Sequence, residues 1–525
     1  MSMASRKQEI VRRIALLAHE QPVLGSGLWF HTDVRNNFYY ASYLFAAAAN
    51  PDLQLSFDRT EAQAKACRIF TELLELQDRD PHSGTYGHWP LHLHPVPREA
   101  EPNSLPVELM GSLLMYFFHR YGAGLPERLR ASMRQALEHV YRSGFFRKPL
   151  RDYNHHEAKY TAAKLLFGQW FGDEELLQDG WQSLKSTLLH VQTKGMPEYG
   201  CLPWFWHWVQ AFTCALEMVR QEEIAADLRA MLDYLWTERS LYYVKGAWAG
   251  PHSRGLSHDI PKDANVLFDY VQYGDFELPH ELPRVEYAGF LSYEAPAQAK
   301  AAALDRSVPA EVKRVVTKQT DSGEVRLNTY AYMTQHYAVG GVLERFREYD
   351  NEQHRWDVTF PLVNHDSVNQ LFFFQPGDHY SAGDPRHQSD GGDIALNRNV
   401  SIALYPAAHG SGERMVGILP KGDWRMEERS LYGFINDEVY AAVFLLLPYA
   451  AEQLDDRITI TGENGSNAVV VEVISTEEAG AIGIGSFDSF VAAMRGKRPQ
   501  FEDAAKGFIR YTSLLGNQVA LSVEI

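Results

Sequence analysis

The sequence is poor in cysteine, in long apolar runs and in targeting signals. Its 525 residues include three cysteines, Cys67, Cys201 and Cys214, with no CxxC pair and no metal-ligand spacing. We therefore expect reduced thiols rather than a disulfide framework. No run reaches the ~18 apolar residues of a membrane span, and the first 25 residues lack the apolar core of a signal peptide. These absences predict a cytoplasmic location and no membrane partner.

Positive charge is also in deficit. The chain carries 67 acidic and 50 basic residues, and its formal net charge is −17 at pH 7. A nucleic-acid partner is not expected, because binding phosphates requires a surplus of Lys and Arg. An anionic sugar remains compatible with this balance, since a cleft can be locally basic in an acidic protein.

Several catalytic motifs are missing. The sequence contains no GxSxG, no P-loop and no GxGxxG placed between a strand and a helix, so serine-hydrolase, nucleotide and Rossmann-cofactor chemistry have no support. The segment HHEAKY is not the HExxH of zinc proteases, because its fifth position is Tyr160. An isolated HxH, His92 and His94, is too weak to predict a metal site. No organic cofactor is expected, and a structural divalent metal is the one inorganic alternative kept open.

The first half of the chain has the periodicity of long helices. The expected helices span 1–20, 33–49, 57–77, 105–122, 126–143, 155–172, 173–195, 203–221 and 222–240. No strands are interleaved, which argues against a doubly wound α/β fold. Helical hairpins of similar length, repeated along the chain, are typical of a solenoid that closes into an α/α toroid. We assign residues 1–315 to this domain.

The second half has the pattern of short strands. From 325–341 onwards, β-branched or alternating segments are separated by Gly, Asn and Asp turns, including one at AGAIGIGS (479–486). One helix is expected at 487–496. About eleven such strands predict a large antiparallel β-sandwich, which we assign to 316–525.

The stretch from 151 to 208 concentrates polar groups suited to proton transfer. It contains Asn154, His155, His156, Glu198, Tyr199 and His207, beside Trp204 and Trp206. In a uronate sugar, the C5 proton lies next to a carboxylate. Amide and imidazole groups can neutralise that carboxylate, while a base takes the proton and a phenol protonates the leaving oxygen. A tyrosine acts as base only where nearby cations stabilise its phenolate. The same residues could also form a polar seam between helices, and Asn154 could be a helix N-cap.

Paired carboxylates support an alternative, since a glycoside hydrolase needs one acid and one base or nucleophile. The acids near loops of the helical half are Asp33, Asp78, Asp80, Asp152, Glu157 and Glu198. Acids at helix ends are more often caps, so no particular pair is favoured. A third hypothesis is a carbohydrate-binding protein that has lost catalysis.

The sequence resembles the toroid-plus-sandwich polysaccharide lyases, the heparinase II/III-like and oligoalginate-lyase group. The resemblance is carried by the Asn-His pair in YNHHEAKY and by Tyr199 in PEYG, 44 residues after His155. It implies that Asn154 and His155 or His156 neutralise the uronate, and that Tyr199 transfers protons. It also implies a histidine from the sandwich, for which His336 is the first candidate and His365 the second.

Other residues are candidates for substrate binding. Arg254 could hold a carboxylate with two parallel hydrogen bonds. Aromatic and imidazole side chains that could line the cleft are Tyr39, Tyr86, His88, Trp89, Trp204, Trp206 and His207, with Glu198 beside them. The sequence thus predicts a lyase that cleaves a uronate-containing oligo- or polysaccharide by β-elimination, acting as a monomer or homodimer.

Overall fold

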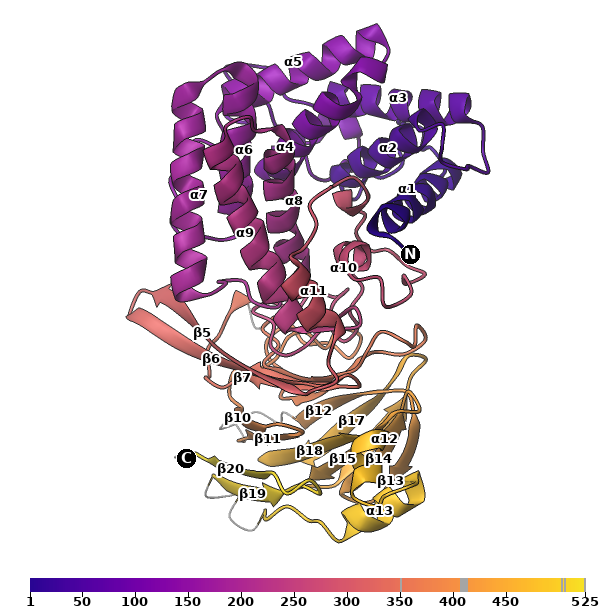
Figure 1. The fold of residues 1–525 in the computed structure, drawn as a ribbon, viewed down its shortest axis with the longest axis vertical. Helices are drawn as coiled ribbons and strands as arrows, with labels where there is room; N and C mark the ends of the chain where they lie inside the picture. Colours follow the sequence, from indigo (N-terminus) through magenta and orange to yellow (C-terminus); the bar gives the residue numbers. More distant parts are fainter. Residues whose placement is uncertain (350–351, 407–413, 502–503, 505–506, 524–525) are drawn as a thin grey trace.

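The computed structural model describes residues 1–349, 352–406, 414–501, 504 and 507–523. A helical N-terminal part lies against a C-terminal part made of sheets (Figure 1). Residues 1–241 form the expected long helices. They are α1 (Met3–Glu20), α2 (Val34–Ala49), α3 (Arg59–Glu75), α4 (Ser104–Tyr121), α5 (Glu127–Ser143), α6 (His155–Phe171), α7 (Glu174–Lys194), α8 (Leu202–Met218) and α9 (Glu222–Leu241).

The helices form two layers. Helices α4, α6 and α8 are buried on nearly every side, whereas α5 and α7 bury one apolar stripe and expose the rest. The inner helices pack on one another and the outer ones cover them, which is the arrangement of an incomplete α/α toroid. Close packing depends on small residues: a Cβ placed on Gly168 of α6 would lie 2.7 Å from the backbone nitrogen of Leu177 in α7.

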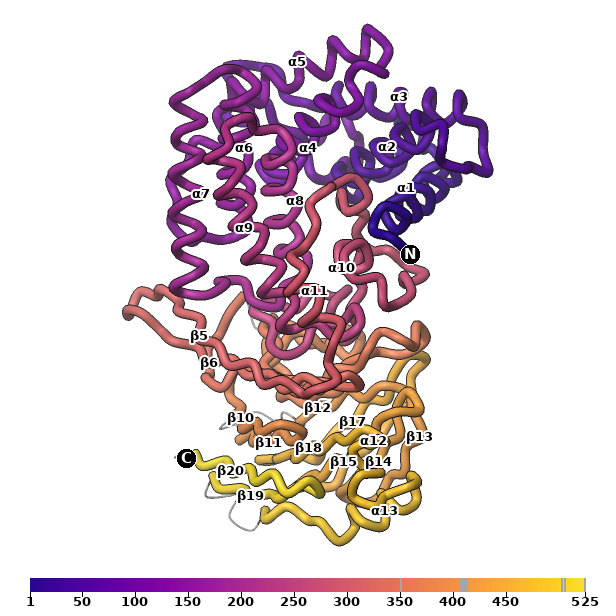
Figure 2. Tube along the Cα trace, viewed as in Figure 1, coloured from indigo at the N-terminus to yellow at the C-terminus, as the bar shows by residue number. Residues whose placement is uncertain are grey.

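The alternating helix directions place several chain segments at the end that faces the sandwich. Helix α7 ends beside the first strand of the sandwich, where Gly195 lies against Val315. Its antiparallel neighbour α6 therefore begins at that end, and α8 begins there too, after a short loop. The tube in Figure 2 shows this end of the helices directly above the first strands. Residues 154–156 and 198–204 are thus brought to one face.

The sandwich consists of two antiparallel sheets within the described residues. The strands are β5 (Ala310–Thr320), β6 (Gly323–Met333), β7 (Ala338–Val342), β8 (Trp356–Thr359), β9 (Gln370–Phe374), β10 (Asp393–Asn397), β11 (Val400–Tyr405), β12 (Arg414–Pro420), β13 (Asp423–Met426), β14 (Ser430–Ile435), β15 (Val439–Leu445), β16 (Tyr449–Gln453), β17 (Arg457–Asn464) and β18 (Asn467–Ser475). The first sheet has the order β16-β17-β12-β9-β8-β7-β6-β5, and the second has the order β10-β11-β18-β15-β14-β13.

The middle strands of the eight-stranded sheet are buried on both faces, and strand β9 shows why. Leu371 and Phe373 point into the core between the two sheets, while Phe372 and Phe374 point the other way and pack against Ile260 from the helical part. Because side chains alternate along a strand, both faces need apolar residues. The hairpin of β19 (Phe508–Thr512) and β20 (Gln518–Ser522) and helix α13 (Phe487–Arg495) cover the outer face of the second sheet.

The fold class is confirmed: a helical toroid precedes an antiparallel sandwich. Two local predictions are wrong. AGAIGIGS is not a strand, because Ser475 and Glu478 form a capping box that starts the short helix α12 (Thr476–Ala481). Strand β5 was not expected. It begins at Ala310 after α11 (Ala297–Leu304), so a boundary at 315/316 passes through β5.

Within the described residues, no helix combines the length and apolarity needed to cross a membrane.

Candidate active site

Asn154 and His155 begin α6 at the face turned toward the sandwich. The Oδ1 of Asn154 accepts hydrogen bonds from the backbone N–H groups of His156 (3.0 Å) and Glu157 (3.2 Å), so Asn154 is the helix N-cap. Its Nδ2 makes no hydrogen bond within the described part of the chain. The cap fixes the oxygen and leaves the amide nitrogen available as a donor.

His155 is held by Glu198. Its backbone N–H donates to Oε2 of Glu198 at 2.7 Å, and its Nδ1 lies 2.6 Å from Oε1. Both side chains are buried, 8% and 3% exposed. Burial raises the pKa of Glu198 to about 7 and lowers that of His155 well below its usual value, so the pair favours its neutral form. Glu198 therefore positions His155, and its carboxylate, expected to bind substrate, is buried in this structure.

His156 forms a second pair of this kind with Glu108. Its Nδ1 lies 2.6 Å from Oε2 of Glu108, which also accepts from Nζ of Lys159 at 3.1 Å, while the hydroxyl of Tyr160 donates to Oε1. Burial alone would raise the pKa of Glu108, but the His156 hydrogen bond and the Lys159 ammonium hold it well below its usual range. The imidazole of His156 is 35% exposed, four times the fraction of His155. Of the two adjacent histidines, His156 is therefore the one that a ligand can reach.

Tyr199 is where the two domains meet at the site. Its hydroxyl donates to Oε2 of Glu348 at 2.6 Å and accepts from Nε2 of Gln353 at 2.9 Å. Lys318 of β5 lies over the phenol ring, 5.3 Å from its centroid, and pairs with Oε1 of Glu348 at 2.5 Å. Burial and the charge of Glu348 raise the pKa of Tyr199 well above its usual value. The resting group is a neutral phenol, which suits an acid better than a base.

Trp204 forms a partly exposed wall of the site. Its ring stacks on His155, with centroids 4.5 Å apart and planes 12° from parallel. The guanidinium of Arg254 lies 5.0 Å from the centroid of Trp204 and 5.8 Å from that of Tyr349, and it pairs with Glu352. The structure brings together the predicted Trp204 and Arg254. The cation over the ring holds the indole in a fixed orientation.

His207 lies on the inner side of His155, with ring centroids 5.8 Å apart. Its Nε2 accepts from Arg284 at 3.2 Å, and Arg284 pairs with Glu286 at 2.8 Å. Burial is the main cause that lowers the pKa of His207 well below its usual value, so the ring is a neutral acceptor. His207 is 4% exposed, and its expected contact with substrate is not supported.

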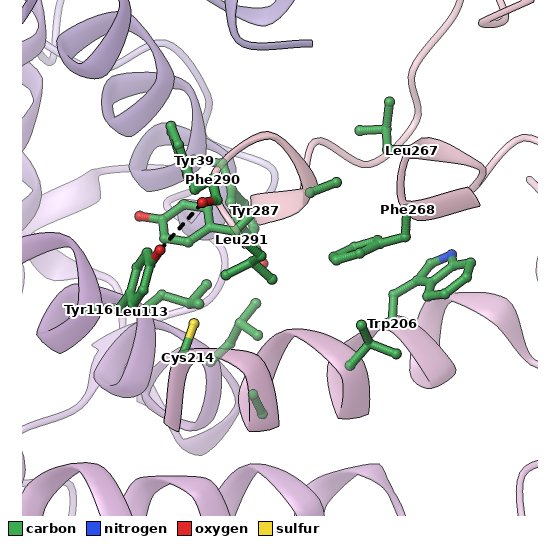
Figure 3. Packing of buried hydrophobic residues seen from close by; sticks show 14 of the residues in the cluster. Tyr39, Leu113, Tyr116, Trp206, Cys214, Leu267, Phe268, Tyr287, Phe290 and Leu291 are labelled. Carbon is green, nitrogen blue, oxygen red and sulfur yellow. Dashed lines mark hydrogen bonds between the residues drawn. The ribbon is translucent and has the colours of Figure 1, made fainter. Parts of the chain in front are cut away.

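Several predicted aromatic residues belong to the core. Trp206 stacks on Phe268 and donates its indole N–H to the carbonyl of Asn265, and Figure 3 shows it deep in the packing. Tyr39 is 4% exposed and lies beside Tyr287, as Figure 3 also shows. Trp89 is fully buried and donates to the carbonyl of Leu73. These three were expected to line the cleft and do not.

Two further candidates, Tyr86 and His88, have other neighbours. Tyr86 bonds to Nδ1 of His139 at 2.8 Å. His88 is half-buried and lies among the charges of Lys148, Asp78 and Glu108.

The predicted sandwich histidines do not lie with Tyr199. His336 sits in the turn between β6 and β7, where it contacts Glu438 and Glu477. Tyr199 packs against Leu327 of β6. From there, the six residues to Met333 correspond to about 20 Å of strand. His365 lies near His280, with ring centroids 5.6 Å apart. The sandwich contributes Glu348 and Gln353 instead.

The acids considered for a hydrolase mostly have structural partners. Asp33 caps α2, and Glu157 accepts from the backbone N–H groups of 151, 152 and 153. Asp78 and Asp80 accept backbone hydrogen bonds within their own loop. None of these forms an acid pair across a cleft in the described residues.

The cations of the site are matched by carboxylates. Lys159 pairs with Glu108, Arg254 with Glu352, Arg284 with Glu286 and Lys318 with Glu348. The site therefore offers many hydrogen-bond donors without a large surplus of positive charge. Among the described residues, no group of three or more His, Cys, Asp or Glu is placed to hold a metal ion.

No protein-family model matches the chain. No curated protein matches it either. Among solved structures, it is similar to a chondroitinase AC lyase studied as enzyme–oligosaccharide complexes, with a TM-score of 0.45 and 11% identity over 99% of this chain and 89% of that chain. It is also similar to the Streptomyces coelicolor A3 chondroitin AC lyase in complex with chondroitin sulphate, with a TM-score of 0.43 and 10% identity over 97% of this chain and 84% of that chain. A third similar structure is a heparinase III, with a TM-score of 0.41 and 9% identity over 99% of this chain and 90% of that chain.

These neighbours are polysaccharide lyases, the class that the Asn-His and Tyr motifs indicated. At these TM-scores and identities, no residue role and no substrate is carried over from them. The assignment of the fold depends on the helices and sheets described above.

Proposed function

We propose that the chain is a glycan lyase that cleaves a uronate-containing oligosaccharide by β-elimination. The observation that carries the proposal is the position of the Tyr199 hydroxyl. It donates to Glu348 of the sandwich at 2.6 Å. Tyr199 also directly follows Glu198, the residue that positions His155. A phenol and two imidazoles, each oriented by a carboxylate, supply an acid, a base and hydrogen-bond donors.

The base in this scheme is His156. It is the exposed imidazole, and its Nδ1 is occupied by the ionised Glu108, which leaves Nε2 to accept a proton. The amide nitrogen of Asn154 donates to the substrate carboxylate, where negative charge develops as the C5–H bond breaks. Glu108 then stabilises the imidazolium that forms on His156.

The acid is Tyr199. As the electron pair from C5 forms the C4–C5 double bond, the C4–O4 bond breaks and O4 takes the phenolic proton. The raised pKa of Tyr199, caused by burial and by Glu348, keeps that proton in place before the reaction. The hydroxyl is buried: Tyr199 is 7% exposed, and the hydroxyl is bonded to Glu348 and Gln353. A substrate must therefore displace these two partners to reach the phenol.

The charge balance of the site favours a weakly charged substrate. Each nearby cation already faces a carboxylate, so a heavily sulfated chain would meet as much repulsion as attraction. One carboxylate per sugar can be met by the Asn154 amide and by Arg254 at the partly exposed wall. Trp204 offers a partly exposed ring edge for apolar contact with a sugar, because His155 stacks on its ring and Arg254 lies over it.

The test is a screen of uronate oligosaccharides with two readouts. A lyase produces an ultraviolet absorbance from the new C4–C5 double bond, together with new reducing ends. Reducing ends without absorbance would indicate the paired-carboxylate hydrolase. Binding without either product would indicate a carbohydrate-binding protein. Either of the last two outcomes would refute the proposal.

A further inference from the structure

A cluster of buried oxygen atoms lies at the junction of the helical part and the sandwich, outside the candidate active site. It contains Asp259, Asp263 and Asn265, from the irregular segment before α10 (Leu267–Gln272), and Gln370 at the start of β9. Their exposed fractions are 1%, 0%, 3% and 0%. Four polar side chains are thus fully withdrawn from solvent at a contact between two domains.

The four groups are tied to each other and to the strand. Asn265 donates from Nδ2 to Oδ1 of Asp259 at 2.6 Å, and Gln370 donates from Nε2 to the backbone carbonyl of Asp259 at 2.9 Å. Asn369 donates from Nδ2 to Oδ2 of Asp263 at 2.9 Å, while the backbone N–H of Asp263 donates back to Asn369. Gln370 also lies 3.4 Å from Oδ2 of Asp263. These bonds bring all four side chains into one network.

Asp259, Asp263, Asn265 and Gln370 each keep one side-chain oxygen without a hydrogen-bond partner. These atoms are Oδ2 of Asp259, Oδ1 of Asp263, Oδ1 of Asn265 and Oε1 of Gln370, none of which meets a donor among the described residues. All four are acceptors. A buried acceptor needs a donor or a cation, and a group of acceptors alone, two of them from carboxyl groups, attracts positive charge.

The nearest cations of the protein do not supply that charge. Arg239 is paired with Asp269, bonding to Oδ2 at 2.7 Å, and Arg284 is paired with Glu286 at 2.8 Å. Burial raises the pKa of Asp263 to about 7, and it raises that of Asp259 well above its usual value. Without a cation, the two carboxyl groups become neutral by taking up protons.

We propose that Asp259, Asp263, Asn265 and Gln370 bind a calcium ion. Calcium prefers carboxylate and amide oxygens and tolerates irregular geometry, whereas magnesium demands a near-ideal octahedron of ligands. Zinc and other transition metals favour His and Cys, and the network contains neither. The two carboxylates balance the two charges of the ion.

The ion would join the domains. Asp259, Asp263 and Asn265 belong to the helical part, and Gln370 to the eight-stranded sheet. Ile260, between two of these residues, already packs against Phe372 and Phe374 of β9. The indole N–H of Trp206 donates to the backbone carbonyl of Asn265 at 2.6 Å. This places a tryptophan next to the site as a natural spectroscopic donor.

The test uses the full-length protein, stripped with a chelator and dialysed. Calcium chloride is expected to bind at one ion per chain and to raise the melting temperature by about 5 °C at a hundredfold excess over its Kd. Terbium chloride is expected to luminesce on excitation of tryptophan, and calcium should displace it. The gain in melting temperature should be larger at pH 8 than at pH 5.5, since protons compete for the same oxygens.

Two isosteric variants and one control locate the ion. Asp263→Asn and Asp259→Asn should each weaken calcium binding at least about tenfold and remove the terbium signal. Glu472→Gln is the matched control: Glu472 is also a buried carboxyl group, but both its oxygens have partners, the Tyr511 hydroxyl and the Leu514 N–H. It should keep the full response to calcium.

The measurements on the wild-type protein test the calcium proposal even if the variants do not fold. No stoichiometric calcium and no tryptophan-sensitised terbium signal would overturn the proposal and leave ordered water or protons as the partners of these oxygens. A response to calcium that persists in a folded Asp263→Asn protein would place the ion elsewhere and would overturn it too.

Discussion

The hydroxyl of Tyr199, at the end of the helical toroid, donates a hydrogen bond of 2.6 Å to the carboxylate of Glu348 in the sandwich. The two residues are 149 positions apart in the chain. The charge of Glu348 raises the pKa of the phenol in addition to the larger effect of burial. One domain therefore sets the acidity of the group that the other presents.

Replacing Glu348 with Gln tests this coupling. The variant keeps a hydrogen-bond acceptor and removes the charge, so the pKa of Tyr199 should fall. Because the acid must be protonated, the alkaline limb of the kcat profile should move to lower pH. The profile is measured from the ultraviolet absorbance of the product. An alkaline limb that stays in place or moves to higher pH would contradict the coupling.

The adjacent histidines should differ in their effects. His156→Gln should lower kcat by about 10²-fold or more, as expected for loss of a general base, and should leave the fold intact because the ring is partly exposed. His155→Gln should cost about 1–3 kcal/mol of stability, since Glu198 loses a buried partner. Steady-state kinetics and urea unfolding separate the two. Equal losses of kcat at equal stability would show that the roles are wrongly divided.

Two tryptophans on the same helix offer a matched comparison. Trp204→Ala should raise KM with a smaller effect on stability, because its ring is only partly buried at the wall of the site. Trp206→Ala should destabilise the protein by about 3–5 kcal/mol, since it empties a core position that is 1% exposed. Thermal melts and KM values measure both. A stable Trp206→Ala variant with a raised KM would reverse the assignment.

The buried carboxyl group of Glu472 should make the stability of the protein depend on pH, and a single substitution tests this. Burial raises its pKa to about 7, whereas an unfolded chain has a value of about 4.3. The folded state keeps the proton between these values, so the stability it contributes is present at low pH and is lost as pH rises to 7. Glu472→Gln has no such proton. The stability of wild type relative to the variant should therefore fall by about 2 kcal/mol from pH 5 to pH 7.5.

Urea unfolding of both proteins at the two pH values measures this difference. A gap that is constant, or that grows with pH, would mean that Glu472 is ionised in the folded protein.

The sequence predicted the long helices well, because amphipathic segments of 16–21 residues bounded by Asp, Asn, Gly or Pro leave few alternatives. All nine expected helices between residues 1 and 241 are present, with ends within a few residues of those expected. Short strands were predicted less completely. The polar alternation of β5, which lies at a sheet edge, gave no strong apolar signal.

The site was predicted in part for a different reason. Asn154, His155 and His156 are consecutive, and Tyr199 follows one helical hairpin later at the same end of the toroid, so two short motifs identified them. Glu108 and Glu348 were missed, because only tertiary packing brings them to His156 and Tyr199. Trp206 and Tyr39 were placed in the cleft because a helical sequence with apolar residues on all sides does not reveal which aromatic faces outward.

The most direct test of the account is the ultraviolet absorbance of an unsaturated uronate product, measured for wild type, Tyr199→Phe and the control Tyr86→Phe. The hydroxyl of Tyr86 bonds to Nδ1 of His139. The account predicts product from wild type and Tyr86→Phe, and none from a Tyr199→Phe protein that is folded. Product from Tyr199→Phe at the wild-type rate, or saturated sugars from wild type, would contradict it.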